Sequence, residues 1–204
     1  MEDYKMVTIK FFNRWGTEGV AVEDIGLQRY LCIDPKIAPK TGARYAGNRF
    51  HKSNTFIVER FATKLMGSGH KSKKHFLSSG HNAGKKVRML GIVEDALAKA
   101  EQRLKVNPLM ILTQAIENAA PREEVIAIEY GGARYPKSVD ISPQRRIDLA
   151  LRFMTQGAYT KSFNKKMKIE DALAEELIGA YQVSAKSNAI AKKRDLERQA
   201  ASSK

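Results

Sequence analysis

The apolar residues of this 204-residue chain recur mainly three and four positions apart, which is the spacing of one face of an α-helix. The clearest stripe is formed by Leu90, Val93, Leu97, Ala100 and Leu104. Helix-start signals precede other stripes, such as Asn54 as an N-cap, Asn107-Pro108 and Ser142-Pro143. The expected helices cover about 54–66, 87–104, 107–119, 142–154, 169–180 and 188–200. The sequence therefore predicts a mainly α fold with about six helices.

One short stretch has a different pattern, that of a β-hairpin. Residues 125–130 are typical of a strand, Gly131-Gly132 of a tight turn, and residues 134–141 of the returning strand. Pro136 cannot donate to a ladder, which makes this strand irregular or an edge. Because a two-stranded ribbon buries little surface by itself, we expect the hairpin to protrude toward a partner. The alternative is a hairpin that folds back on the helices.

The first 53 residues differ from the rest, since glycines and prolines interrupt their short apolar pieces. We interpret residues 1–53 as an extended basic N-terminal arm that packs on a core or on a partner. Residues 54–204 are then a single helical domain, with a basic loop at 67–86 and the hairpin at about 123–141. No internal repeat is visible.

The charge is distributed unevenly. The formal net charge is +14, and residues 35–93 hold thirteen basic residues and a single acidic one, Glu59, for a net charge of +12. Residues 1–34 are slightly acidic, at −2. A concentration of positive charge of this kind is typical of a surface that docks on a polyanion.

Several classes of protein are excluded. The single cysteine, Cys32, excludes a framework of internal disulfides and suits a reducing compartment. The N-terminus lacks the apolar segment of a signal peptide, and no run approaches the ~18–20 apolar residues of a membrane span. We therefore expect a soluble, intracellular protein that binds nucleic acid. Lying on an anionic membrane surface is the alternative that the charge alone leaves open.

No motif predicts catalysis, a metal site or a cofactor. His70, His75 and His81 do not have the spacing of a zinc site. The glycine- and lysine-containing segment 80–86 resembles a phosphate-binding loop only loosely, because it has three residues between its glycines and no Ser or Thr after its lysine. We interpret it as a basic turn before a helix, a place where backbone N–H groups favour phosphate.

The positive signal is a mixture of basic residues, glycines and aromatics in residues 40–52. Lysine and arginine neutralise phosphates, glycine permits close backbone approach, and aromatic rings stack on unpaired bases. The alternatives are that Tyr45 and Phe50 anchor the arm to the core, and that the lysines form a merely solvated face.

The order of several motifs resembles the small-subunit ribosomal protein seven family, from about Trp15 to Gln199. The motifs are Val58-Glu59-Arg60-Phe61, Gly84-Lys85-Lys86, Asn107-Pro108-Leu109, Ala115-Ile116-Glu117-Asn118, Pro121-Arg122-Glu123-Glu124, Val139-Asp140-Ile141-Ser142-Pro143-Gln144-Arg145-Arg146, Ala174-Glu175-Glu176-Leu177-Ile178 and Lys192-Lys193-Arg194-Asp195-Leu196-Glu197-Arg198. The long arm with Gly42 to Gly47 is similar to the archaeal and eukaryotic branch.

The resemblance implies a helical domain with a protruding ribbon that binds the 3′ major domain of small-subunit rRNA and nucleates assembly of the subunit head. It also implies a ribbon near the exit-site tRNA and the mRNA path, neighbouring head and platform proteins, and no small-molecule substrate. Residues 71–79 look like an insertion relative to the family pattern, so their contacts cannot be transferred from it.

Two groups of site residues are expected from the charge pattern and the resemblance together. The rRNA-binding residues are Lys40, Arg44, Arg49, Lys52, Lys71, Lys73, Lys74, Lys85, Lys86, Arg88, Arg122, Arg145, Arg146, Lys192, Lys193 and Arg194. The hairpin residues near tRNA and mRNA are Arg134, Tyr135 and Lys137.

Two other hypotheses belong to different classes. A DNA-binding regulator would join two short helices by a three- or four-residue turn. The connection at 67–86 is too long for that, although the shorter links elsewhere do not exclude it. An RNA-modifying enzyme would need a cofactor loop or a placed general base, and the sequence has neither.

Overall fold

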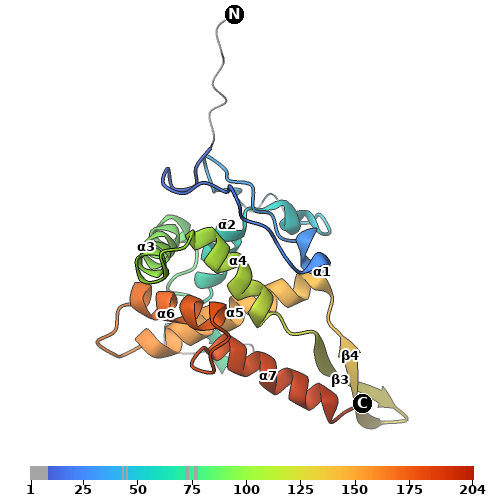
Figure 1. Cartoon of the computed structure of the whole chain (residues 1–204). Helices are drawn as coiled ribbons and strands as arrows, with labels where there is room; N and C mark the ends of the chain where they lie inside the picture. The colour runs from blue at the N-terminus through green and yellow to red at the C-terminus, as the bar shows by residue number, and fades with distance from the viewer. Residues whose placement is uncertain (1–8, 43, 45, 72–73, 76–77) are drawn as a thin grey trace, which may run out of the picture.

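The structure, a computed structural model, describes residues 9–42, 44, 46–71, 74–75 and 78–204. Its helical body is organised around α6 (Ile169–Tyr181), which contacts α3 (Lys86–Leu104), α4 (Pro108–Ala119), α5 (Pro143–Ser162) and α7 (Asn188–Ala201) (Figure 1). The central position suits α6 because it is mostly apolar and buries Leu173 and Leu177 completely. The six expected helices are thus α2 to α7, and the prediction of a mainly helical fold with a hairpin is confirmed.

The helix starts agree with the sequence in most places but not at α2 (Ile57–Leu65). Asn107 caps α4 by accepting a hydrogen bond from the Leu109 N–H at 3.0 Å, as expected. The prediction that Asn54 caps the first helix is wrong. Asn54 ends a 3-10 helix, η1 (His51–Asn54), and Phe56 occupies the N-cap of α2. Phe56 is buried, so its packing in the core fixes where the helix begins.

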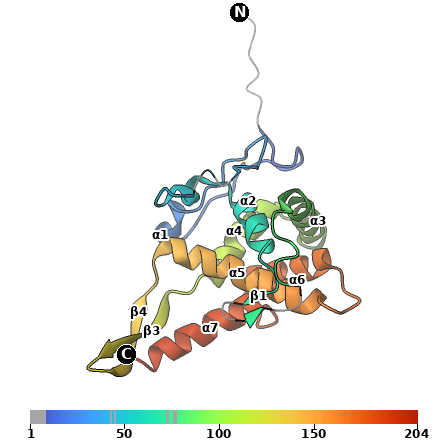
Figure 2. The ribbon, with the colours of Figure 1, turned by 180° about the vertical axis from the view of Figure 1, so that it is seen from behind.

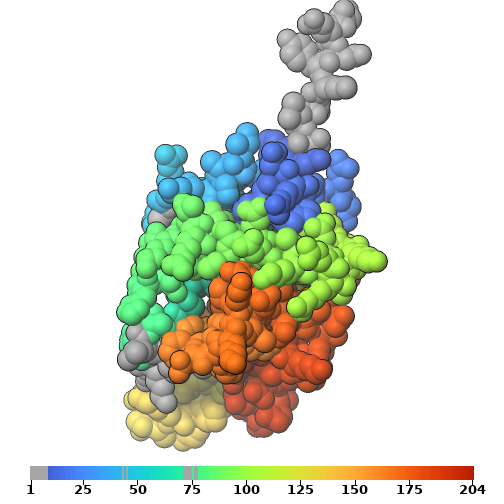
Figure 3. Space-filling model, turned by 90° about the vertical axis from the view of Figure 1, so that its left-hand side faces the viewer, coloured from blue at the N-terminus to red at the C-terminus, as the bar shows by residue number. Residues whose placement is uncertain are grey.

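Among the described residues before η1, Phe11, Trp15 and Leu27 pack on the helical body. Phe11 and Trp15 pair as a β-bridge, and their rings are 5.1 Å apart in the core. The Trp15 indole N–H donates to Glu101 on α3 at 2.8 Å. A short helix, α1 (Ile25–Gln28), follows and buries Leu27. In Figure 3 these residues cover one end of the molecule, and the hairpin lies at the other end.

The hairpin consists of β3 (Glu123–Tyr130) and β4 (Ala133–Asp140), which pair from Glu123–Asp140 to Tyr130–Ala133. Gly131 and Gly132 both have positive φ, at 58° and 81°, as a two-residue hairpin turn requires. The tip is exposed, whereas the base contacts α7, and the Ser138 N–H donates to the Ser203 carbonyl at 3.3 Å. The hairpin therefore projects from the helices but is fixed at its base (Figure 1).

The basic loop contains structure that its composition did not predict. Strand β1 (His70–Lys71) pairs antiparallel with β2 (Lys74–His75). The Ser78 and Tyr159 hydroxyls are 2.6 Å apart, which ties the loop to α5. Seen from behind, α2 lies beside α5, and β1 lies below α5 in this view (Figure 2).

Candidate nucleic-acid interface

The cations of the N-terminal segment lie around surface recesses. Lys40 and Arg44 are exposed and line a recess of about 380 Å³ together with His51, Asn54 and Thr55, among others. Arg49 is also exposed, and its guanidinium lies 5.1 Å from the Phe50 ring centroid, next to a second recess of about 460 Å³. These three predicted residues are therefore accessible to a large polyanion.

The single acidic residue of the basic stretch, Glu59, is turned inward. Its side chain is fully buried on α2 and forms an ion pair with Lys86 at the start of α3. The Thr41 N–H and hydroxyl each donate to the same oxygen, Oε1, at 2.8 Å. Burial alone would raise the pKa of Glu59, but the hydrogen bonds from Lys86 and Thr41 outweigh it and lower the pKa below 4.5. Glu59 thus joins the arm to the start of α3 as a carboxylate.

Because Thr41 and Lys86 contact the same Glu59 oxygen, the start of α3 lies next to the part of the arm around Thr41. Lys85 and Arg88 are exposed, and Gly84 precedes them with a φ of 75°. Lys86, in contrast, is half-buried in its pair with Glu59. The three residues that were predicted together therefore have different surroundings, and two of them face solvent.

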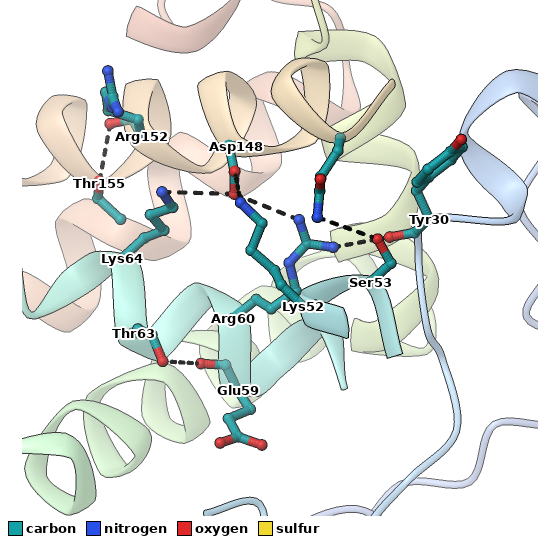
Figure 4. Close-up of polar contacts among 11 residues, drawn as sticks. Tyr30, Lys52, Ser53, Glu59, Arg60, Thr63, Lys64, Asp148, Arg152 and Thr155 are labelled. Atoms are coloured by element: carbon teal, nitrogen blue, oxygen red, sulfur yellow. Dashed lines mark hydrogen bonds and ion pairs between the residues drawn. The ribbon is translucent and has the colours of Figure 1, made fainter. Parts of the chain in front are cut away.

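A second carboxylate, Asp148 on α5, is shared by three cations (Figure 4). Lys52 pairs with Asp148 Oδ2, and the Arg60 and Lys64 nitrogens lie 3.4 and 3.6 Å from Oδ1. Arg60 also donates to the Tyr30 carbonyl at 2.8 Å. One negative charge therefore holds together cations from η1 and α2 against α5.

This cluster has more positive than negative charge, and the pKa values reflect it. Burial would raise the pKa of Asp148, but the hydrogen bond from Lys52 and the charges of Lys64 and Arg60 lower it below 3.8. Burial lowers the pKa of Lys64, and the neighbouring charges of Arg152 and Lys52 lower it further, against the attraction of Asp148. An additional anion would relieve this repulsion.

The arginines at the base of the hairpin make contacts within the protein. Arg145 forms two hydrogen bonds of 2.7 Å with the Glu124 carboxylate. Arg146 donates to Asp24 at 2.9 Å and to the Pro121 carbonyl at 3.2 Å. Arg145 remains exposed, whereas Arg146 is largely enclosed by these partners. The pair fixes the junction of hairpin, α1 and α5, and Arg122 lies exposed beside it.

The tip of the hairpin presents rings and charges to solvent. Arg134, Tyr135 and Lys137 are exposed on β4, and Tyr130 is 82% exposed on β3. The register sets Tyr135 opposite Ile128, so aromatic and apolar side chains share one face of the ribbon. Arg134 lies 3.5 Å from the Glu129 carboxylate.

The predicted cations of α7 and of the basic loop have varied positions. Lys192 is exposed and lies 3.7 Å from Asp195, Arg194 is exposed, and half-buried Lys193 donates to the Asn118 carbonyl at 2.8 Å. Burial lowers the pKa of Lys193. Lys71 and Lys74 pair through their backbones, and Lys73 lies outside the described residues, as do Tyr45 and part of the expected insertion.

Other kinds of site find little support in the described part of the chain. No three His, Cys, Asp or Glu side chains there gather to hold a metal ion, although the His70 and His75 Nδ1 atoms are 3.0 Å apart. No helix there has the length and apolarity to cross a membrane. Cys32 is half-buried, and burial raises the pKa of its thiol, which disfavours the reactive thiolate.

The sequence reasoning missed Lys64, Arg152 and Asp148. The i, i+4 spacing of Arg60 and Lys64 in a predicted helix would have put both on one face. Nothing local indicates that α5 crosses this face, and so the shared carboxylate becomes visible only in the structure.

Comparison with known proteins adds an independent finding. A family model described as "Ribosomal protein S7p/S5e" matches residues 27–204. The chain is 50% identical over 196 residues to small ribosomal subunit protein uS7 of Nanoarchaeum equitans, covering 96% of this chain and 99% of the relative. It is 41% identical over the same shares to the uS7 protein of Methanosphaera stadtmanae. Identity to that of Methanothermobacter thermautotrophicus is 42%, over 92% of this chain and 95% of the relative.

Proposed function

The chain belongs to the ribosomal protein S7p/S5e family, and we propose that it binds the 3′ major domain of small-subunit rRNA and nucleates assembly of the subunit head. Membership in the family confirms the resemblance seen in the sequence, including its archaeal character, since the relatives are archaeal. The family is a structural, non-enzymatic component of the small subunit in the cytoplasm, so the hypotheses of an RNA-modifying enzyme and of a DNA-binding regulator are set aside.

The observation that carries the proposal is the buried position of Glu59, the single acidic residue of the basic stretch 35–93. Glu59 is buried and paired with Lys86, while Lys40, Arg44 and Lys85 remain exposed on either side of this junction. The arm and the start of α3 thus form a positively charged surface. No exposed carboxylate from residues 35–93 offsets this charge, because Glu59 is the single acidic residue there and is buried. Such a surface releases counterions when it neutralises RNA phosphates.

The hairpin supports a second part of the same proposal. Its exposed tip combines Arg134 and Lys137 with the rings of Tyr130 and Tyr135. Cations contact phosphates and aromatic rings stack on unpaired bases, which suits single-stranded or looped RNA. In line with what the family resemblance implies, we propose that the tip lies near the exit-site tRNA and the mRNA, and that neighbouring head and platform proteins flank it.

The test is a binding titration with a transcript of the 3′ major domain over a range of salt concentrations. Log affinity should fall linearly with log salt. Lys85→Gln should weaken binding and flatten this slope by about one, because it removes one phosphate contact without touching the Glu59 pair. Lys166→Gln is the matched control, since Lys166 is exposed in a loop outside the proposed surface. Salt-insensitive binding, or equal affinity for unrelated duplexes, would contradict the proposal.

A further inference from the structure

One recess of the N-terminal segment has a mostly apolar lining, unlike the recesses beside Arg44 and Arg49. Its volume is about 380 Å³, and its lining includes Ile9, Phe11, Phe12, Ile37, Phe56 and Val58. Phe11 and Phe56 are each only 2% exposed, so the bottom of the recess is part of the core. Ile9 and Ile37, in contrast, are 43% and 86% exposed. A recess with exposed apolar side chains around it is typical of a site that takes an apolar group from a partner.

Positive charge adjoins this apolar recess. Lys10 and Lys36 line it and are exposed, and Lys36 donates to the Asn54 carbonyl at 3.3 Å. Lys36 also lines the recess that contains Lys40 and Arg44. No Asp or Glu is among the described residues that line either recess. The apolar recess and the basic recess therefore adjoin at Lys36, and four cations face no carboxylate within them.

The chemistry of the two recesses together matches a polypeptide better than a nucleic acid. Unpaired bases stack on the faces of exposed aromatic rings. The rings that line the apolar recess are buried or half-buried, and the exposed side chains there, Ile9 and Ile37, are aliphatic. A leucine or phenylalanine of a partner would bury its side chain against them. Acidic residues next to that anchor would pair with the lysines, because opposite charges across an interface select the partner.

We propose that these two recesses bind an acidic segment of a partner protein, with an apolar anchor beside Ile37 and carboxylates on Lys36, Lys40 and Arg44. The inference rests on the proposed function, because Lys40 and Arg44 are also assigned there to rRNA. The acidic segment and the rRNA therefore compete for the same cations. Such a partner binds the free protein, covers part of its positive charge and is released when rRNA binds.

A synthetic peptide tests the recesses in the free protein. In the labelled probe, Leu-Phe lies between short runs of Asp and Glu, and fluorescence anisotropy measures its binding. In one matched peptide Ser-Ser replaces Leu-Phe, and in another Lys replaces the acids. The Ser-Ser peptide should bind about tenfold more weakly than the probe, because the apolar anchor is lost, and the Lys peptide should not bind. Equal binding of the probe and the Ser-Ser peptide would reveal only general charge attraction and overturn the proposal, as would a probe that does not bind.

Substitution of Ile37 locates the contact. Ile37→Ser should weaken binding of the probe about tenfold and leave the affinity for the 3′ major domain transcript unchanged. Ile25→Ser is the matched control, since Ile25 is 87% exposed and does not line the apolar recess. Circular dichroism verifies that both variants are folded. If the two variants bind the probe equally, the anchor lies elsewhere. If Ile37→Ser weakens the transcript instead of the probe, the recess is an RNA contact and the proposal fails.

Competition between the probe and the transcript tests the release step. Added transcript should displace the labelled peptide, and the apparent Kd of the peptide should rise in proportion to the transcript concentration. A complex that holds peptide and transcript together would overturn the release step. A transcript that does not bind the wild-type protein would contradict the proposed function itself, whereas the peptide titration and the Ile37→Ser variant would still decide whether the recesses bind an acidic segment.

Discussion

At the scale of single residues, the positive surface depends on where its few carboxylates point. Glu59 and Asp148 each lie within a group of cations and hydrogen-bond donors. Their ion pairs fix the positions of the basic side chains around them. An exposed acid at either position would instead repel phosphate. The surface therefore remains basic because these two carboxylates point inward and pair with cations there.

Glu59 gives a prediction about pH. Its pKa is lower in the folded protein than the usual 4.5, so it contributes stability above about pH 4.5 that is lost as the pH falls through the folded value. Glu59→Gln should lower the free energy of unfolding at pH 7 by about 3–5 kcal/mol, the cost of leaving a buried charge unpaired. The variant should also lose less stability than the wild-type protein between pH 5 and pH 3.

Urea denaturation followed by circular dichroism at a series of pH values measures both effects. Glu18→Gln is the control, because Glu18 is exposed. It should follow the wild-type curve. Identical pH dependence of the wild-type protein and Glu59→Gln would show that another group governs acid stability.

At the scale of elements, a glycine and a glutamate determine how three helices meet. Glu176 on α6 is fully buried and accepts from the Ser187 hydroxyl at 2.9 Å and the Asn188 N–H at 3.0 Å. It thereby caps α7, whose N-cap residue Ser187 makes no capping bond with its own side chain. Gly157 on α5 leaves the space that this carboxylate occupies: a Cβ there would lie 2.7 Å from the Glu176 carboxyl group.

Gly157→Ala should therefore destabilise the protein, by about 1–3 kcal/mol, because the added methyl group collides with Glu176 and with Asn188 Cβ. Gly91→Ala on α3 is the matched control. Nothing lies within 4 Å of a Cβ at Gly91, so alanine should raise stability by about 0.5–1 kcal/mol through helix propensity. Thermal unfolding compares the two variants, and a neutral Gly157→Ala would mean that α5, α6 and α7 can move apart at little cost.

Sequence signals within a few residues predicted the helices well. Where the structure differs from the prediction, contacts between elements explain the difference. The stripe in α3, the Asn107-Pro108 start of α4 and the Gly131-Gly132 turn are each contained within a few residues. The start of α2 depends on burial of Phe56, which its neighbours in sequence do not determine. In the candidate site, the sequence predicted which stretches are basic. It could not predict that Lys85 is exposed while Lys86 is half-buried. The two lysines differ because Lys86 pairs with Glu59, which lies 27 residues earlier in the sequence.

At the scale of the whole molecule, the N-terminal segment and the helical body share a core. Phe11, Trp15 and Leu27 pack in the same cluster as residues of α2 to α6. The division between an arm at 1–53 and a domain at 54–204 remains a prediction, and the shared core suggests how to test it.

Trp15 is the single tryptophan of the chain, so its fluorescence reports on the N-terminal segment alone. Since its ring is only 7% exposed and its indole N–H bonds to Glu101, the emission should shift to longer wavelength when this segment detaches. We expect the fluorescence and the far-ultraviolet circular dichroism to change in one coincident urea transition. A fluorescence transition at lower urea would show instead that the segment unfolds separately as an arm.

The crowded cations around Asp148, which are Lys52, Arg60 and Lys64, also have a thermodynamic consequence. In the free protein their mutual repulsion opposes compaction, so added salt should make the free protein more stable by screening that repulsion. In a complex with a polyanion the same charges are attractive, and added salt weakens the complex. One set of side chains therefore gives salt opposite effects on the free protein and on a complex with a polyanion, and binding of a polyanion would add to the stability of the fold.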